Sequence, residues 1–329
     1  QKLMGIYQLN PIYSETKNQV MKKPKGPYSA LFSSILCCWF FCCAVCIGLL
    51  WGCAAVPTKT QLGDKPQTFE ENTIISSQLG RPVEFKKLVE DLNRCRIIYV
   101  GEKHTNVFHH EIQFEIIQAV YKDHPNLVVG MEMFDRSYQT FLDEWSAGQL
   151  DERTFLRKVH WYANWRYDFS LYRDILNFIK ENNIRLVGLN IPFHIPSKIR
   201  VGGIENLGDD DKIYLPKKID TSNQDHREYV AGVFEHHNFG GKVDFEDFYT
   251  AQAVWDDAMA AAVADNLGND VMIVLAGNGH IQYKYGVPDR AFRLTSVAFR
   301  TIYPVAVGEN IDLKVADYIW VTKSSKNRQ

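Results

Sequence analysis

Four acidic or imidazole side chains stand directly after short apolar runs of the sequence. The four are Glu102, His104, Glu132 and His280. The runs before them, at residues 97–100, 127–131 and 271–276, have the length and apolar content of buried strands. Ligands of open α/β sheets collect outside the carboxyl ends of the strands. We therefore expect these side chains to meet at one edge of a sheet, with His104 and His280 close together.

Two kinds of chemistry suit this set of residues. Neutral imidazoles and carboxylates can together hold a divalent transition metal such as Mn, Co or Zn. Without a metal, an imidazole can act as a general base on water while a carboxylate orients it. One Gly-x-x-His turn is a short pattern, but acids or imidazoles at three strand ends favour a functional site. The sequence predicts a catalytic or metal-binding site made of Glu102, His104, Glu132 and His280, and leaves both uses open.

An aromatic cluster without strand alternation occupies residues 160–168. Its members Trp161, Tyr162 and Tyr167 could stack on a flat ligand, and a phenolate among them could bind ferric iron, because Tyr and His both serve as haem axial ligands. The competing interpretation is a lid or a piece of core under a loop. Without a partner motif, the aromatic residues alone favour that second interpretation.

Two adjacent histidine pairs, His109–His110 and His236–His237, are secondary candidates. Neighbouring residues on a helix point about 100° apart, so neither pair can chelate a metal by itself. We expect one member of each pair to face solvent.

The elements that must position these residues alternate along the chain. Strand-like runs occupy residues 97–100, 127–132, 184–190 and 271–276, and helical spacing is found at residues 83–92, 108–120, 137–159, 171–181 and 245–267. This alternation predicts an α/β domain with a mostly parallel central sheet covered by helices on both faces. Residues 292–304 and 315–321 alternate like strands and should extend or flank that sheet. The sequence has no GxGxxG motif and no Walker loop, so it shows no recognisable nucleotide cradle.

Composition restricts the class of protein. The chain has 329 residues, a formal net charge of -2 and 46% hydrophobic residues. A nucleic-acid-binding domain needs a basic surface, so this balance gives no case for nucleic acid. The length suits one large domain or two small ones.

The N-terminal region has the pattern of a secretory signal. A basic cluster at residues 22–25 precedes an apolar run at residues 30–50, and Cys53 follows a small residue, as in a bacterial lipoprotein signal. We expect Cys53 to be lipidated, or the run to stay as an uncleaved membrane anchor, since about 20 apolar residues span a bilayer. Only Cys95 lies in the body of the chain, which excludes a disulfide framework there.

These observations divide the chain into four expected parts. We interpret residues 1–20 as a gene-model artefact ahead of a start at Met21, and residues 21–53 as the signal peptide or N-terminal anchor. Residues 54–80 are polar and contain prolines, which indicates a tether. Residues 81–321 are expected to form the α/β domain.

Several motifs, taken in order, resemble the ChaN family of haem-binding uptake lipoproteins in the Tiki superfamily. The motifs are Gly101-Glu102-Lys103-His104, Gly130-Met131-Glu132-Met133-Phe134, Asn190-Ile191-Pro192, Gln252 to Met259, and Gly277-Asn278-Gly279-His280 before Gly286-Val287-Pro288. The likeness covers residues 96–304. It implies a bacterial cell-envelope lipoprotein that binds haem, takes part in haem or iron uptake and works with outer-membrane uptake machinery. The wider superfamily includes metal-dependent proteases and erythromycin-esterase-like hydrolases, whose matching positions implicate His104, Glu132 and His280.

Two functions therefore remain. The first is a membrane-anchored protein that binds haem through an axial Tyr or His, for which His104, His280, Trp161, Tyr162 and Tyr167 are the candidate contacts. The second is a metal-dependent esterase or peptidase that uses the Glu102, His104, Glu132 and His280 set. A haem carrier has no evident need for that set, which is the reason to keep the second function.

Overall fold

A computed structural model describes residues 59–61, 68–236 and 243–324, all of which belong to the compact unit Val56–Gln329. The predicted artefact at residues 1–20 and the predicted signal with Cys53 lie outside the described residues. Across the three described ranges, no helix is both long enough and apolar enough to cross a membrane.

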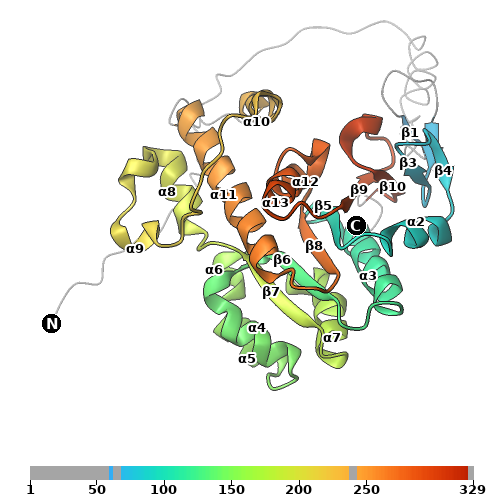
Figure 1. The fold of residues 1–329 in the computed structure, drawn as a ribbon, viewed down its shortest axis with the longest axis horizontal. Helices are drawn as coiled ribbons and strands as arrows, with labels where there is room; N and C mark the ends of the chain where they lie inside the picture. Colours follow the sequence, from blue (N-terminus) through green and yellow to red (C-terminus); the bar gives the residue numbers. More distant parts are fainter. Residues whose placement is uncertain (1–58, 62–67, 237–242, 325–329) are drawn as a thin grey trace, which may run out of the picture. The chain divides into compact units, whose positions relative to one another are not determined.

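An eight-stranded sheet forms the centre of this unit (Figure 1). Its strands, in spatial order, are β4 (Arg81–Val83), β3 (Ile74–Ser76), β10 (Tyr318–Thr322), β9 (Phe299–Ala306), β5 (Ile97–Glu102), β8 (Met272–Gly277), β6 (Val128–Asp135) and β7 (Arg185–Asn190). The six strands from β10 to β7 run parallel, and only β3 and β4 pair antiparallel at one side. A separate hairpin pairs β1 (Lys59–Gln61) with β2 (Thr68–Glu70). The predicted mostly parallel sheet is confirmed.

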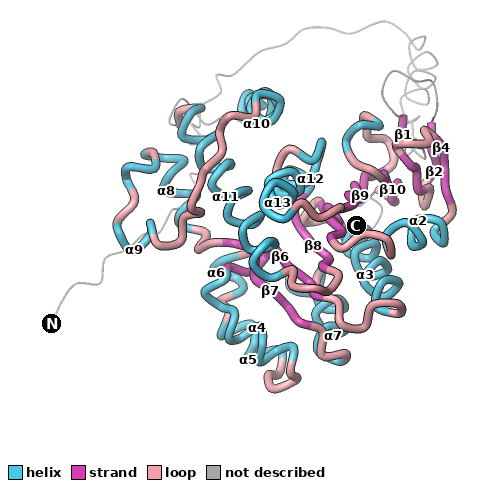
Figure 2. Tube along the Cα trace, in the orientation of Figure 1, coloured by secondary structure: helices cyan, strands magenta, loops and turns pink. Residues whose placement is uncertain are grey.

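Helices connect the strands and cover the sheet (Figure 2). They are α2 (Phe85–Leu92), α3 (Val107–Tyr121), α4 (Gln139–Ser146), α5 (Glu152–Lys158), α6 (Trp161–Asn164), α7 (Arg173–Glu181), α8 (His194–Gly202), α9 (Asp209–Lys212), α10 (Gln224–His236), α11 (Phe245–Asn266), α12 (Asn278–Ile281) and α13 (Val287–Thr295). The predicted helical stretch 137–159 is two helices, because Gly148 takes a φ of +72° between them.

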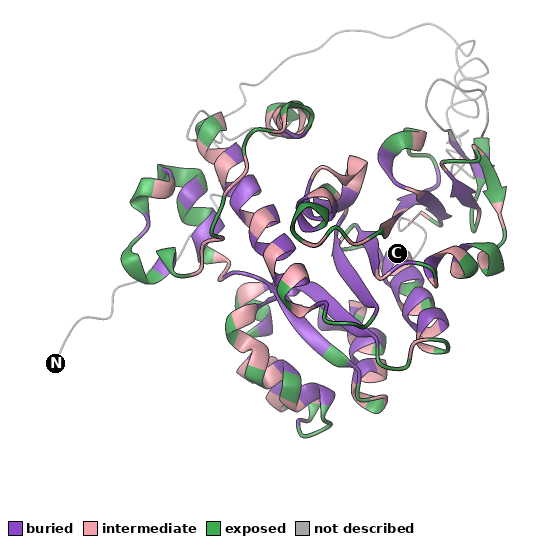
Figure 3. Cartoon of the chain, viewed as in Figure 1, coloured by how far each residue is buried: buried purple, intermediate pink, exposed green. Residues whose placement is uncertain are grey.

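The central strands are buried on both faces, as Figure 3 shows. Successive side chains of a strand point to opposite faces. In β5, Ile98 and Val100 pack with residues of α2, α3, α4 and α7, whereas Ile97 and Tyr99 pack with residues of α11 and α13. These continuous apolar runs made the strands recognisable in the sequence, and they confirm that helices cover both faces.

Two stretches differ from the sequence expectation. Residues 292–295, predicted as the start of a strand, form the end of α13, which begins after Gly286 with Pro288 in its first turn and buries Ala291 against α11. The alternation of apolar and polar residues at the end of this short helix also fits a strand, so the sequence pattern did not distinguish the two. Within the stretch predicted as a tether, residues 68–70 and 74–76 form β2 and β3, and β3 belongs to the main sheet.

Candidate functional site

The carboxyl ends of β5, β8 and β6 lie side by side and carry the four predicted residues. In the register of the sheet, Glu102 is opposite Gly277, and β6 pairs with the other side of β8. Between Met131 and Asp135 the register of β6 shifts, which re-aims the end of the strand that carries Glu132. The structure therefore brings Glu102, His104, Glu132 and His280 together at one edge, as their positions after the strands led us to expect.

Glu102 holds the imidazole of His104. One carboxylate oxygen of Glu102 lies 2.7 Å from Nδ1 of His104 and accepts a hydrogen bond from the Tyr172 hydroxyl at 2.6 Å. Its other oxygen accepts a hydrogen bond from Nε2 of Gln113 at 2.8 Å. Glu102 is fully buried, whereas the His104 side chain is 27% exposed. Glu102 thus orients His104 and turns its Nε2 side towards Gly277, where a Cβ would lie 3.2 Å from that nitrogen and 3.5 Å from Oε2 of Glu132.

The charge environment favours the protonated form of His104. Burial alone would lower the pKa of His104, but the hydrogen bond to Glu102 and the charges of Glu132 and Glu102 outweigh burial and raise it. The His104 side chain is also partly open to solvent.

The loop before α3 is fixed by the adjacent pair His109 and His110, and both are buried. Nδ1 of His109 accepts a hydrogen bond from the backbone N–H of Lys103 at 2.9 Å, and Nε2 of His110 lies 3.1 Å from the carbonyl oxygen of His104. The expectation that one of the two faces solvent is wrong, because the loop that carries His104 folds over the first turn of the helix. Burial lowers the pKa of His109 to about 3, so His109 stays neutral.

Glu132 lies between the two histidines. Its Oε2 accepts a hydrogen bond from the backbone N–H of Gly277 at 2.6 Å, and its Oε1 is 3.4 Å from Nε2 of His280. Burial alone would raise the pKa of Glu132, but the charges of His280 and His104 lower it to about 2. A Cβ on Gly277 would lie 2.9 Å from Cε1 of His104, so only glycine fits between β8 and the imidazole.

His280 is held from behind by Asp256, which the sequence reasoning did not assign to the site. Oδ1 of Asp256 is 2.6 Å from Nδ1 of His280, and Nε2 of Gln252 is 3.1 Å from the same nitrogen. Burial lowers the pKa of His280, but Glu132 and Asp256 outweigh this and raise it to about 10. The signal that could have found Asp256 is the motif Gln252 to Met259, in which Gln252 and Asp256 lie four residues apart on α11.

The aromatic cluster divides into buried and exposed members. The rings of Trp165 and Tyr167 lie 4.8 Å and 5.0 Å from the ring of His104, so this loop covers the site. Trp161 is fully buried, and its Nε1 donates a hydrogen bond to the carbonyl oxygen of Tyr167 at 2.8 Å. Tyr162 is 59% exposed. Trp161 therefore belongs to the core, and Tyr162 and Tyr167 are the members that an external ligand could reach.

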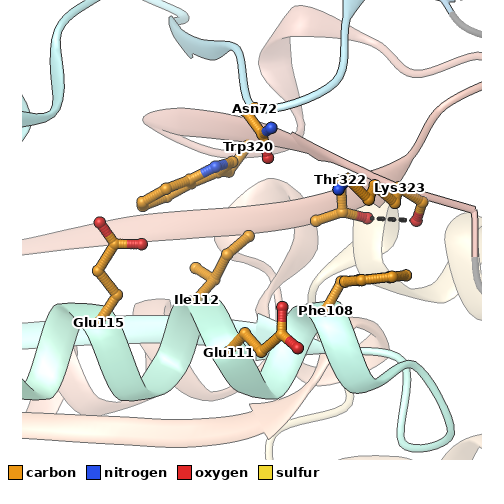
Figure 4. Close-up of a pocket in the computed structure, with 8 residues that line it drawn as sticks. All are labelled: Asn72, Phe108, Glu111, Ile112, Glu115, Trp320, Thr322 and Lys323. Carbon is orange, nitrogen blue, oxygen red and sulfur yellow. Dashed lines mark hydrogen bonds between the residues drawn. The ribbon is translucent and has the colours of Figure 1, made fainter.

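A metal site gains no support from this geometry. Within the described part of the chain, no three His, Cys, Asp or Glu side chains are arranged to hold a metal ion. Two cavities of the described structure also lie away from His104. One of about 130 Å³ opens between α3 and β10, where Glu111 and Glu115 of the helix flank Trp320 of the strand (Figure 4). The other, of about 360 Å³, opens at the opposite edge of the sheet beside Cys95 and Arg96.

Comparison with known families decides the membership of the chain. The family model described as "Haem-binding uptake, Tiki superfamily, ChaN" matches residues 88–291, which is more than half of the chain. The chain belongs to the ChaN family. The match spans all four site residues and Asp256, and it confirms the resemblance that the motifs indicated.

The relatives with solved structures are distant. A structure of ChaN of Campylobacter jejuni, which shows cofacial heme binding, is 20% identical and has a TM-score of 0.61; the match covers 75% of this chain and 95% of that one. At that identity the likeness shows the ChaN fold. An erythromycin esterase mutant, EreC, is 16% identical over 72% of this chain and 77% of its own, with a TM-score of 0.42, which is too low to assign a shared site.

A curated plant protein also matches this ChaN-family chain. Protein RETICULATA-RELATED 5, chloroplastic, from Arabidopsis thaliana is 23% identical in an alignment of 259 residues that covers 70% of this chain. The chain spans about a third (34%) of the length of that relative.

Proposed function

We propose that this protein binds haem and contributes to haem or iron uptake. The observation that carries the proposal is membership of the ChaN haem-binding family over residues 88–291. The Campylobacter jejuni ChaN protein, which has the same fold, binds heme cofacially, and this supports the same ligand for the present chain.

The residues on the covering loop fit a haem better than the buried centre does. His280 is 7% exposed, and both of its ring nitrogens face carboxylates, at 2.6 Å and 3.4 Å. A haem iron could not reach either nitrogen without breaking an ion pair. By contrast, Tyr162 and Arg166 are both exposed, four residues apart in the same stretch, and Lys103 is exposed next to His104 in the sequence. A phenol can serve as an axial ligand of haem iron, and cations can pair with the two propionates.

Tyr162 is accordingly the residue that we expect to hold the iron, with Tyr167 as the next candidate. The haem iron, when bound, supplies the ligand-binding and redox chemistry. The protein's own contribution is to hold the porphyrin by apolar and aromatic contact and to pair its propionates with Arg166 or Lys103. The His104 side chain is 27% exposed, so it is a third candidate contact at the inner side of the loop.

Hemin titration followed by visible absorption tests the proposal. A saturable Soret band with the wild-type protein supports haem binding, and its loss or shift in Tyr162→Phe identifies the ligand. Tyr121→Phe, on the helix α3, serves as a control for the removal of a phenol far from the covering loop. The absence of a saturable band in the wild type would overturn the proposal.

Membrane attachment is a second part of the proposal. Its support is the sequence of residues 21–53, in which an apolar run ends at Cys53. If the protein is a bacterial envelope lipoprotein, mass spectrometry should show a lipid on the wild type that is absent from Cys53→Ala. If the apolar run is an uncleaved anchor, the mass of both proteins should include residues 21–53. The name of the Arabidopsis relative places that protein in the chloroplast. Import of the present chain into plastids would therefore contradict attachment to a bacterial envelope. Fractionation of cells that express the full chain separates these outcomes.

A second candidate function, hydrolysis of an ester or amide by acid–base catalysis, is favoured by one observation. Two carboxylate–imidazole pairs, Glu102–His104 and Asp256–His280, face Glu132 from opposite sides. A carboxylate that holds the Nδ1–H of an imidazole prepares its Nε2 for proton transfer. Hydrolysis of an activated ester that disappears in His104→Gln but persists in Tyr162→Phe would support it. Equal residual rates in wild type and His104→Gln would remove it.

A further inference from the structure

Behind His280 lies a buried network that neither haem binding nor the two carboxylate–imidazole pairs account for. It consists of Asp256 and Asp257 on α11, His226 on α10 and Arg290 on α13. In Figure 1 these three helices lie on the same side of the sheet as α12, which carries His280. His226 and Arg290 are 1% and 3% exposed and Asp256 is fully buried, whereas the Asp257 side chain, at 11%, reaches the rim of the network. Burying this many charged groups requires that each has a partner.

The contacts form a continuous chain from Arg290 to His280. Nη1 of Arg290 lies 2.6 Å from Oδ2 of Asp257, and its Nη2 lies 3.3 Å from Nδ1 of His226. Nε2 of His226 lies 3.4 Å from Oδ2 of Asp256, whose Oδ1 contacts Nδ1 of His280 at 2.6 Å. The same Asp257 oxygen accepts a hydrogen bond from the backbone N–H of Asp220 at 2.7 Å.

Donor and acceptor rules fix the tautomer of His226. Nδ1 of His226 lies 3.3 Å from Nη2 of Arg290 and 3.5 Å from the Tyr249 hydroxyl oxygen; because the guanidinium has only donors and is the nearer group, the contact favours an Nδ1 that accepts and carries no hydrogen. The hydrogen of a neutral His226 then lies on Nε2, which faces the carboxylate of Asp256. Asp256 in turn accepts from the Nδ1–H of His280, which leaves Nε2 of His280 directed at Glu132.

We propose that Arg290 and His226 are positioning residues that orient the carboxylate of Asp256. Because Asp256 holds Nδ1 of His280, they also determine that Nε2 is the ring nitrogen directed at Glu132. Neither residue touches the candidate haem surface, so the proposal stands or falls independently of haem binding. If the acid–base function holds, it adds the groups that keep the His280 ring in one orientation.

Nitrogen NMR of the full chain labelled at histidine tests the proposal. Long-range ¹H–¹⁵N correlations show which ring nitrogen of each histidine carries hydrogen, and His226→Asn and His280→Asn assign the two residues. In the wild type we expect His226 as the single Nε2–H tautomer and His280 with a downfield Nδ1–H from its 2.6 Å contact with Asp256. In Arg290→Met we expect His226 to lose the single tautomer and the His280 Nδ1–H signal to shift or broaden. Arg290→Lys, which keeps a cationic donor, should restore both signals.

Arg173→Met is the control. Arg173 lies on α7 and pairs with Glu152 at 2.9 Å, so its removal breaks an ion pair outside the network and should leave the His226 and His280 signals unchanged. An Nδ1–H tautomer or a charged His226 in the wild type would overturn the proposal, even if Arg290→Met fails to fold. Unchanged signals in a folded Arg290→Met would overturn it as well.

Discussion

Nδ1 of His280 lies 2.6 Å from Oδ1 of Asp256, a residue 24 positions earlier in the chain and on a different helix. This contact joins the edge of the sheet to α11 and gives His280 a carboxylate on its inner side, opposite Glu132 on its outer side. Two buried carboxylates around one imidazole keep that imidazole charged. The stability of the protein and its dependence on pH should both reflect this arrangement.

Removing the charge of Asp256 should destabilise the protein. In Asp256→Asn the buried His280 loses one of its two carboxylates, and breaking a buried ion pair by removing one partner typically costs about 3–5 kcal/mol. Urea unfolding followed by circular dichroism measures the change. Asp265→Asn, at an exposed position of the same helix, should change the free energy of unfolding by no more than about 0.5 kcal/mol. Equal effects of the two substitutions would contradict the arrangement.

Stability should fall as the pH rises above neutrality. The pKa of His280 is about 10 in the folded state against 6.5 ordinarily, so the folded state binds the proton more tightly. The stabilisation is then complete below pH 6.5 and is lost as the pH rises towards 10, with a size on the order of a few kcal/mol. Unfolding free energies at about pH 6.5 and about pH 9.5 measure the loss. The loss of stability should be smaller in His280→Gln, in which only His104 still contributes a raised histidine pKa. An equal loss in the wild type and in His280→Gln would refute the raised pKa of His280.

Gly277→Ala should disturb the site more than Gly279→Ala. The added Cβ at position 277 would lie 2.9 Å from the His104 ring, and such overpacking costs about 1–3 kcal/mol. At position 279 the nearest atom is the Tyr229 hydroxyl oxygen at 3.8 Å, an ordinary contact. Thermal unfolding of the two variants, together with the NMR signal of His104, provides the comparison. A His104 signal that moves in the Gly279 variant and stays fixed in the Gly277 variant would be inconsistent with the described packing.

Much of the fold could be predicted because its signals are local. The buried strands are continuous apolar runs, and the residues after them had to meet once the strands were parallel neighbours, which placed Glu102, His104, Glu132 and His280 at one edge. The helix α13 was missed because its few residues also alternate like a strand.

The second half of the site could not be derived from spacing. Asp256, His226 and Arg290 come from three helices, and their contacts depend on how those helices pack on the sheet. The buried pair His109–His110 was missed for a related reason. Helical geometry shows that two neighbours diverge, but it does not show that a loop will cover both.

The most direct test of the central claim is a hemin titration of the full chain in lipid nanodiscs, against empty nanodiscs. Wild type, Tyr162→Phe and Glu132→Gln are compared by visible absorption. Haem binding on the covering loop predicts a saturable Soret band in the wild type, a weakened or shifted band in Tyr162→Phe, and an unchanged band in Glu132→Gln. A wild type without a saturable band, or a band lost in Glu132→Gln and kept in Tyr162→Phe, would contradict the account.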